Sequence, residues 1–149
     1  MPSVQRGWDM EAKYDDIGVN YAVTRQTDPT IARQLYAKLD GATRIVNIGA
    51  GAGSYEPSGV DLVAVEPSME MIAQRPDGAY PAYQGAAECL PFDDASFSHA
   101  MTVLSMHHWV DQSRAFAEVN RVATEKFVAI TWDPSAGPFW LTRDYFPEI

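Results

Sequence analysis

IVNIGAGAGSYEPSGVDLVAVEPS, residues 45–68, is the stretch that decides the fold of this chain. Gly49, Gly51 and Gly53 stand at alternate positions directly after an apolar run, and Glu66 closes the next apolar run. A turn at the end of a strand needs residues that tolerate positive φ and let a ligand approach the backbone, and glycine meets both needs. The glycines alone leave a plain turn without a ligand as the alternative.

The residues that follow the glycines narrow the choice of ligand. A dinucleotide-binding fingerprint is G-x-G-x-x-G, and it opens a full helix whose N-terminus holds the pyrophosphate. Here the pattern is G-x-G-x-G, and Pro57 and Gly59 leave room for barely one helical turn before the next strand. Glu56 is also expected to repel a pyrophosphate. The segment therefore favours a nucleoside without a phosphate group, and an NAD-dependent oxidoreductase is the weaker alternative.

Glu66 suits a nucleoside because its carboxylate can accept hydrogen bonds from both hydroxyls of a ribose. The alternative is a solvated charge at the end of a strand. The glycine loop that precedes Glu66 in the chain favours the ribose interpretation.

The rest of the chain alternates between expected strands and helices. The expected strands cover residues 44–48, 62–66, 79–84, 98–106 and 126–132, and the expected helices cover residues 29–39, 67–75, 111–123 and 138–146. This alternation predicts a doubly wound α/β fold, in which a parallel sheet has helices on both faces. Ligands of such folds bind at the carboxyl ends of the strands, which places Gly49, Glu66, Ala87 and Ser105 along one rim.

Composition excludes several classes of function. The chain has 149 residues, 46% of them hydrophobic, and a formal net charge of −9 without a cluster of Lys or Arg, so we expect no binding to nucleic acid or to a membrane surface. Its single cysteine, Cys89, excludes a disulfide framework, and no metal site is expected. The sequence also has no apolar run near the ~20 residues of a membrane helix and no signal peptide, which favours a cytoplasmic protein.

Two further segments, GAAECLPFDDASF at 85–97 and AMTVLSMHHW at 100–109, complete a pattern with VNIGAGAG at 46–53 and VAVEPS at 63–68. Together these four motifs resemble class I S-adenosylmethionine-dependent methyltransferases of the methyltransferase type 11 group. YDDIGVNYAVTR at 14–25 is similar to the family more loosely. The resemblance implies a Rossmann-like sheet with strands in the order 3-2-1-4-5, and S-adenosyl-L-methionine as the cofactor.

The resemblance also implies roles for individual residues. The backbone of the glycine loop approaches the methionine part of the cofactor, Glu66 binds the ribose, and a helical cap covers the site. The residues implied around the cofactor are Tyr21, Arg25, Asn47, Gly49, Ala50, Gly51, Glu66, Pro67, Met69, Ala86, Ala87, Glu88, Leu104 and Ser105.

Within this set, Pro67 and Met69 pack on the adenine, and Leu104 and Ser105 line the methionine end. Plain core packing is the alternative for Met69 and Leu104, and a solvated charge is the alternative for Arg25.

Two positions depart from the family pattern. Asn47 stands where the family often has an acid, so it keeps a hydrogen-bonding side chain without the charge that would attract an ammonium and a sulfonium. Ala86 stands where an acid often contacts the adenine amine, and Glu88 is the candidate replacement, with a solvent-facing side chain as the alternative.

Methyl transfer from a sulfonium is an in-line displacement, so proximity and alignment supply much of its rate. A general base is needed only where the acceptor must lose a proton, and His107 and His108 are the candidates. Packing at the end of a strand is the alternative for both. We therefore expect methyl transfer from S-adenosylmethionine to a small-molecule acceptor, and the alternative is a non-catalytic or truncated S-adenosylmethionine-binding domain.

The expected organisation is a single domain over residues 1–149, with a helical cap and first helix in 1–40 and the core sheet in 44–132. Class I methyltransferases usually complete the sheet with two further strands, which do not fit after Trp132. We therefore expect a chain that is incomplete at its C-terminal end, or a second copy that covers the exposed fifth strand.

Overall fold

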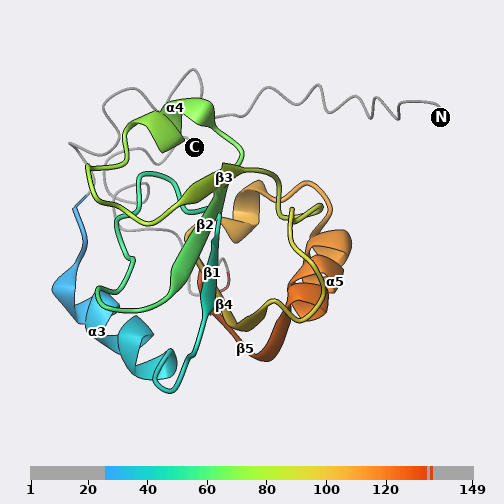
Figure 1. Ribbon diagram of the computed structural model, residues 1–149, viewed down its shortest axis with the longest axis horizontal. Coiled ribbons are helices and arrows are strands. Elements are labelled where there is room, and N and C mark those ends of the chain that lie inside the picture. Colours follow the sequence, from blue (N-terminus) through green and yellow to red (C-terminus); the bar gives the residue numbers. More distant parts are fainter. Residues whose placement is uncertain (1–25, 134, 136–149) are drawn as a thin grey trace.

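Five parallel strands form the centre of the molecule (Figure 1). They are β1 (Ile45–Ile48), β2 (Leu62–Glu66), β3 (Ala82–Gln84), β4 (Phe97–Val103) and β5 (Ala123–Ile130), in the spatial order β3-β2-β1-β4-β5. The computed structural model describes residues 26–133 and 135. Every neighbouring pair is parallel, so the predicted fold and strand order are confirmed.

The two faces of the sheet carry different helices, as Figure 1 shows. On one face, α5 (Gln112–Val122) buries Ala115, Val119 and Val122 in a cluster with alternate residues of the strands. On the other face, α3 (Pro29–Lys38) packs Leu35 in a second cluster. Each large side chain that leaves water entirely in these clusters contributes about 1.5–3 kcal/mol.

Local sequence signals explain where the helices begin. Asp28 accepts hydrogen bonds from the N–H groups of Thr30 and Ile31 and so caps α3, and Asp111 caps α5 through the N–H of Arg114. The short helix α4 (Met69–Ala73) begins after Ser68, whose side chain accepts from the N–H of Met71. The expected helix over 67–75 is therefore too long, because the Ser68 cap leaves Pro67 outside.

Several expected strand ends are also corrected. β3 covers only 82–84 and lies at the edge of the sheet, since Pro81 has no N–H to donate to a neighbouring strand. β4 ends at Val103, and the 3-10 helix η1 (Met106–His108) follows it. β5 begins at Ala123, directly after α5, and ends at Ile130, before the expected end at 132. The expected helix over 138–146 lies outside the described residues.

No helix stands between β1 and β2, where residues 49–61 form turns. This agrees with the sequence, which left room there for barely one helical turn. Among the described residues, no helix is long and apolar enough to span a membrane.

Candidate functional site

The glycine turn lies at the carboxyl end of β1 and is tied to the end of β2. The N–H groups of Gly49 and Ala50 both donate to the carbonyl of Val65, at 2.9 and 3.0 Å. Gly49 and Gly51 have φ values of 68° and 54°, in the left-handed region that favours glycine. The turn therefore presents bare backbone at the rim where β1 and β2 end.

Gly49 also touches the turn that follows β4. A Cβ atom built on Gly49 would overlap the hydroxyl of Ser105. The Ser105 hydroxyl accepts a hydrogen bond from Trp109 Nε1 at 3.3 Å, and its residue is buried. The structure thus brings together two predicted cofactor residues that lie far apart in the sequence.

Glu66 is the centre of the rim. It is only 4% exposed, its Oε2 accepts from the N–H of Gly51 at 2.8 Å, and its Oε1 accepts from the N–H of Ser68 at 2.9 Å. Two backbone donors therefore fix the carboxylate against the glycine turn. Each carboxylate oxygen can accept more than one hydrogen bond, so this arrangement still suits hydroxyl donors of a ligand.

Asn47 is a buried residue of β1, with 4% of its surface exposed, and its side chain lies on the face of the sheet that α3 covers. Its Nδ2 donates to Glu56 Oε1 at 3.0 Å, and the carboxylate fixes which way the amide points. Among the described residues, no donor reaches Asn47 Oδ1. A buried acceptor without a partner is uncommon and costs free energy, which makes it a candidate contact for a ligand.

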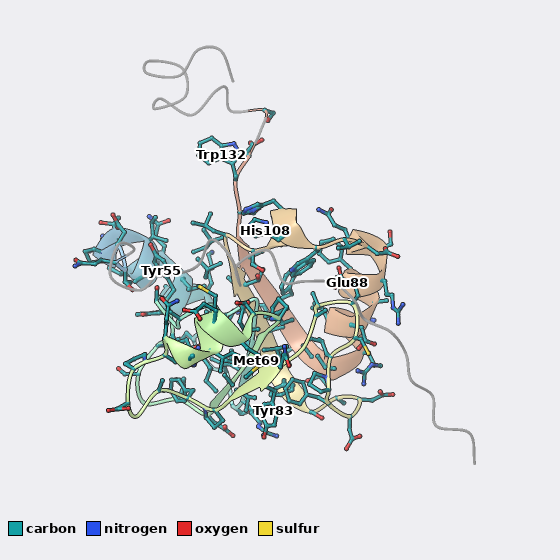
Figure 2. All side chains as sticks on the ribbon, turned by 90° about the horizontal axis from the view of Figure 1, so that it is seen from above. Tyr55, Met69, Tyr83, Glu88, His108 and Trp132 are labelled. Atoms are coloured by element: carbon teal, nitrogen blue, oxygen red, sulfur yellow. The ribbon has the colours of Figure 1, made fainter. Side chains whose placement is uncertain are left out.

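Pro67 and Met69 follow Glu66 on the outside of the molecule. Pro67 is exposed, and Met69 is 53% exposed. Figure 2 labels Met69, which belongs to the start of α4. Exposure of a large apolar side chain next to Glu66 argues against the plain core interpretation of Met69.

The loop after β3 carries Ala86, Ala87 and Glu88. Ala87 is buried and Ala86 half-buried. Glu88 is also buried, and its Oε1 accepts from the backbone N–H groups of Val110 and Asp111, at 2.7 and 3.2 Å. The solvent-facing alternative for Glu88 is therefore wrong, because this side chain ties the loop to the start of α5.

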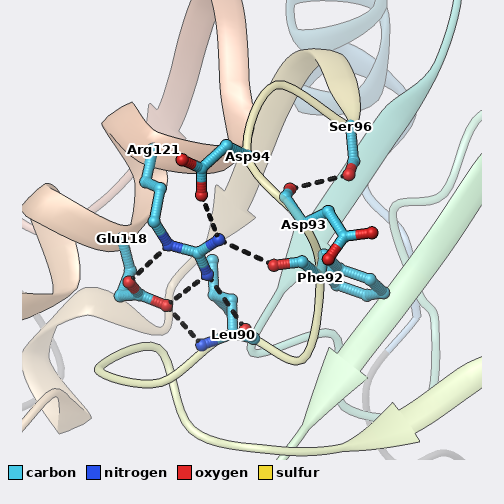
Figure 3. A network of polar contacts seen from close by, with 7 residues as sticks. All are labelled: Leu90, Phe92, Asp93, Asp94, Ser96, Glu118 and Arg121. Carbon is cyan, nitrogen blue, oxygen red and sulfur yellow. Dashed lines mark hydrogen bonds and ion pairs between the residues drawn. The ribbon is translucent and has the colours of Figure 1, made fainter.

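Arg121 in α5 holds a later part of the same loop (Figure 3). Its guanidinium donates to the carbonyls of Leu90 and Phe92, at 3.1 and 2.7 Å, and binds both carboxylate oxygens of Glu118 at 2.8 Å. Glu118 in turn accepts from the N–H of Leu90 at 2.8 Å. The resulting hydrogen bonds hold the pKa of the Glu118 carboxyl below its ordinary value, with Arg121 as the largest cause.

The segment after β4 supplies the remaining candidates. Leu104 has a φ of 51°, which is rare for a side chain of this size, and it is 37% exposed. His107 and His108 lie in η1, and their ring centroids are 3.9 Å apart. Figure 2 shows His108 and Trp132 toward the same end of the molecule, where β4 and β5 finish.

The structure also shows site features that sequence reasoning missed. The sequence predicts that the Glu56 charge repels a pyrophosphate, and this prediction is wrong because Arg75 Nη2 pairs with Glu56 Oε2 at 2.7 Å. The two residues lie in different connections, so no periodicity or motif signals their contact. Tyr21 and Arg25, both predicted near the cofactor, lie outside the described residues.

A hollow of about 330 Å³ lies between the β1–β2 connection and the loop after α4. It is lined by Ala52, Gly53, Glu56, Pro57, Ser58, Gly59, Pro76, Gly78, Ala79 and Tyr80. None of the predicted cofactor residues within the described part of the chain lines it. The candidate site therefore rests on the hydrogen bonds and close contacts of the rim, and this hollow is a separate feature.

Comparisons with known proteins identify relatives in sequence and in fold. A family model described as a methyltransferase domain matches residues 46–126. An uncharacterized methyltransferase of Mycobacterium tuberculosis is 40% identical over 111 residues, which cover 69% of this chain and 42% of that protein. The chain thus spans less than half the length of this curated relative.

Two solved structures are similar in fold. One is a protein of Anabaena variabilis named as a methyltransferase from an antibiotic biosynthesis pathway, with a TM-score of 0.74, 31% identity, and coverage of 83% of this chain and 53% of that one. The other is an S-adenosylmethionine-dependent methyltransferase of Thermotoga maritima, named as a possible histamine N-methyltransferase. Its TM-score is 0.62, with 26% identity and coverage of 74% of this chain and 55% of that one.

Proposed function

This chain belongs to the methyltransferase type 11 domain family, and we propose that it binds S-adenosylmethionine and transfers its methyl group to a small-molecule acceptor. The observation that carries the proposal is the Glu66 carboxylate, which is 4% exposed and fixed against the glycine turn by the N–H groups of Gly51 and Ser68. Each oxygen of this carboxylate can accept a further hydrogen bond, and the two hydroxyls of a ribose would act as the donors.

Two further features of the rim fit this cofactor. Asn47 Oδ1 is a buried acceptor without a donor among the described residues, and the ammonium of a methionine group would supply one. At Gly49 a Cβ atom would overlap Ser105, so the turn keeps its backbone bare where the methionine part is proposed to pass. Asn47 is uncharged, so its contact would be weaker than that of an acid.

The remaining contacts follow from the same rim. Glu66 would hold the ribose, and Pro67 and Met69 would cover one side of the adenine. Ala86, Ala87 and Glu88 would lie along the edge of the adenine, and Leu104 and Ser105 would line the methionine end. Ala50 and Gly51 would meet the ligand through backbone groups, and Tyr21 and Arg25 are proposed to cover it.

The cofactor, when bound, would supply a methyl group attached to a sulfonium, and the neutral thioether that remains after the transfer is a good leaving group. The chain itself would then orient the two reactants and exclude water, which suffices for an acceptor that carries a free lone pair. For an acceptor that must lose a proton, His107 or His108 in η1 would hold that proton, since η1 follows directly on the Leu104–Ser105 turn.

A small molecule is the proposed acceptor because the net charge of −9 opposes nucleic acids and anionic lipids. The names of the Anabaena variabilis and Thermotoga maritima proteins, an antibiotic pathway and histamine, point to the same class of acceptor for those proteins. The acceptor of this chain is sought by incubating it with S-adenosylmethionine and a metabolite extract, and reading products by a mass increase of one CH2 group.

Two rival functions both predict no methylated product in that experiment, and they differ in the ligand that the chain would bind. A non-catalytic domain would bind S-adenosylhomocysteine and yield no methylated product. An NAD-dependent oxidoreductase binds NADH and yields no such product either. The lack of a helix in residues 49–61 counts against it, because a dinucleotide site places its pyrophosphate at the N-terminus of that helix.

A further inference from the structure

The β1–β2 connection is held to the sheet by a buried polar network in the place where a helix would otherwise pack. Glu56 is its centre: Oε1 accepts from Asn47 Nδ2 at 3.0 Å, and Oε2 accepts from Arg75 Nη2 at 2.7 Å. The side chains of Arg75 and Glu56 are only 5% and 6% exposed. This ion pair, whose side chains are almost entirely out of water, links the connection before β2 to the segment after α4.

Arg75 also reaches the glycine turn directly. Its Nη2 donates to the carbonyl of Tyr80 at 3.2 Å, and its Nη1 lies 3.5 Å from the carbonyl of Gly51, at the long end of the hydrogen-bonding range. A Cβ atom on Gly53 would lie 3.1 Å from Nη1 and 3.2 Å from Glu56 Oε2. The ion pair therefore lies against the turn, and the lack of a side chain at Gly53 lets it approach.

An ion pair of this kind contributes little to the stability of the fold by itself. Removing two charges from water costs several kcal/mol per ion, and apolar residues of the same volume often stabilise a fold as well or better. Here the cost is increased because Arg75 Nε has no partner among the described residues. Directional hydrogen bonds, in contrast, fix positions that apolar packing leaves loose.

From these contacts we propose that Glu56 and Arg75 are positioning residues for cofactor binding, an inference that rests on the proposed function. Gly51 connects the two parts: its carbonyl faces Arg75, and its N–H donates to Glu66 at 2.8 Å. Glu56 orients Asn47 in the same way, since holding Nδ2 leaves Oδ1 free for the ligand. This one ion pair thus fixes the positions of both the Glu66 carboxylate and the Asn47 acceptor.

The test separates positioning from stability with a double variant. Arg75→Met alone leaves a buried carboxylate unpaired and is expected to lower the unfolding midpoint strongly. The double variant Glu56→Gln/Arg75→Met removes both charges of this pair, and its amide keeps a carbonyl for Asn47. It should recover most of the unfolding midpoint, while its affinity for S-adenosylhomocysteine stays about tenfold or more below that of the parent chain.

A second readout needs no ligand. Hydrogen exchange of the Gly51 amide, followed by NMR, should be about tenfold or more faster in the double variant, since the amide is no longer held against Glu66. Asp61→Asn is the matched control: it removes an exposed charge from the same connection, and both affinity and exchange should stay unchanged.

The outcomes distinguish this proposal from the proposed function. A double variant with recovered stability and with parental affinity and Gly51 exchange would overturn the positioning role. If the parent chain itself fails to bind S-adenosylhomocysteine, the proposed function is wrong. The exchange rate of Gly51 then still decides whether the ion pair positions the turn.

Discussion

Gly49 occupies a backbone conformation and a space that no larger residue fits. Its φ is 68°, and a Cβ atom would overlap the side chain of Ser105. Gly59 is a useful comparison because its φ is 74° but nothing lies within 4 Å of the added atom. The two positions thus separate conformational strain from steric overlap.

We predict that Gly49→Ala destabilises the chain by about 2–4 kcal/mol, since strain and overlap add. Gly59→Ala should cost only about 1 kcal/mol, from the positive φ alone. Urea unfolding of the two variants measures both values. Equal losses of unfolding free energy in the two variants would mean that steric overlap with Ser105 adds no cost at Gly49.

At this scale, the sequence predicts residues whose role depends on a local pattern. Glu66 and the glycines could be identified because they follow strands at fixed positions in a motif. The contact between Glu56 and Arg75 could not be predicted, because Arg75 lies 19 residues away in the sequence and in another connection. Glu88 was predicted beside the adenine, yet its contacts with Val110 and Asp111 depend on how two loops meet.

At the scale of elements, α5 is joined to the loop after β3 by Arg121 and Glu118. The Glu118 carboxyl has a lowered pKa because Arg121 hydrogen-bonds its charged form. A carboxyl whose folded pKa lies below its unfolded pKa stabilises the fold at pH values above the unfolded one. That contribution is lost as the pH falls through the folded pKa.

We predict that Glu118→Gln reduces the acid sensitivity of folding. Between about pH 5 and pH 3, the parent chain should lose more unfolding free energy than the variant, because only the parent gives up the charged contact with Arg121. Urea unfolding at a series of pH values measures the difference, and Glu125→Gln on the exposed part of β5 is the control. If the unfolding free energies of the parent chain and of Glu118→Gln fall in parallel with pH, the Glu118–Arg121 pair does not contribute to acid unfolding.

Elements were predicted well where burial alone defines them. The runs IVNI and LVAVE form β1 and β2 almost as expected, because both are buried throughout. The ends of β4 and β5 were placed wrongly because tertiary contacts decide them. Leu104 turns out of the sheet with a positive φ while its N–H donates to Ile130 at 2.7 Å, and no sequence pattern indicates that turn.

At the scale of the whole molecule, β5 lies at one edge of the described sheet. Its pairing partner in the described residues is β4, and its length is 8 residues. An exposed strand edge pairs readily with another chain unless something covers or charges it.

We predict that two copies associate along β5, with a sedimentation coefficient that rises with protein concentration. Ala129→Lys places a charge on an exposed position of this strand and should abolish the rise without lowering the unfolding midpoint. Glu125→Lys changes an exposed position nearer the start of the strand, and its effect on the rise can be compared with that of Ala129→Lys. A parent chain that remains monomeric at high concentration would show that the edge is covered in another way.

The central claim is that the rim around Glu66 binds S-adenosylmethionine, and calorimetric titration with S-adenosylhomocysteine tests it most directly. The parent chain should bind this ligand and not NADH. Glu66→Ala should weaken binding by about 1–3 kcal/mol, because partnered polar groups lose their contact, while Asp61→Ala should bind as the parent does. No binding by the parent chain, or an unchanged affinity in Glu66→Ala, would contradict the account.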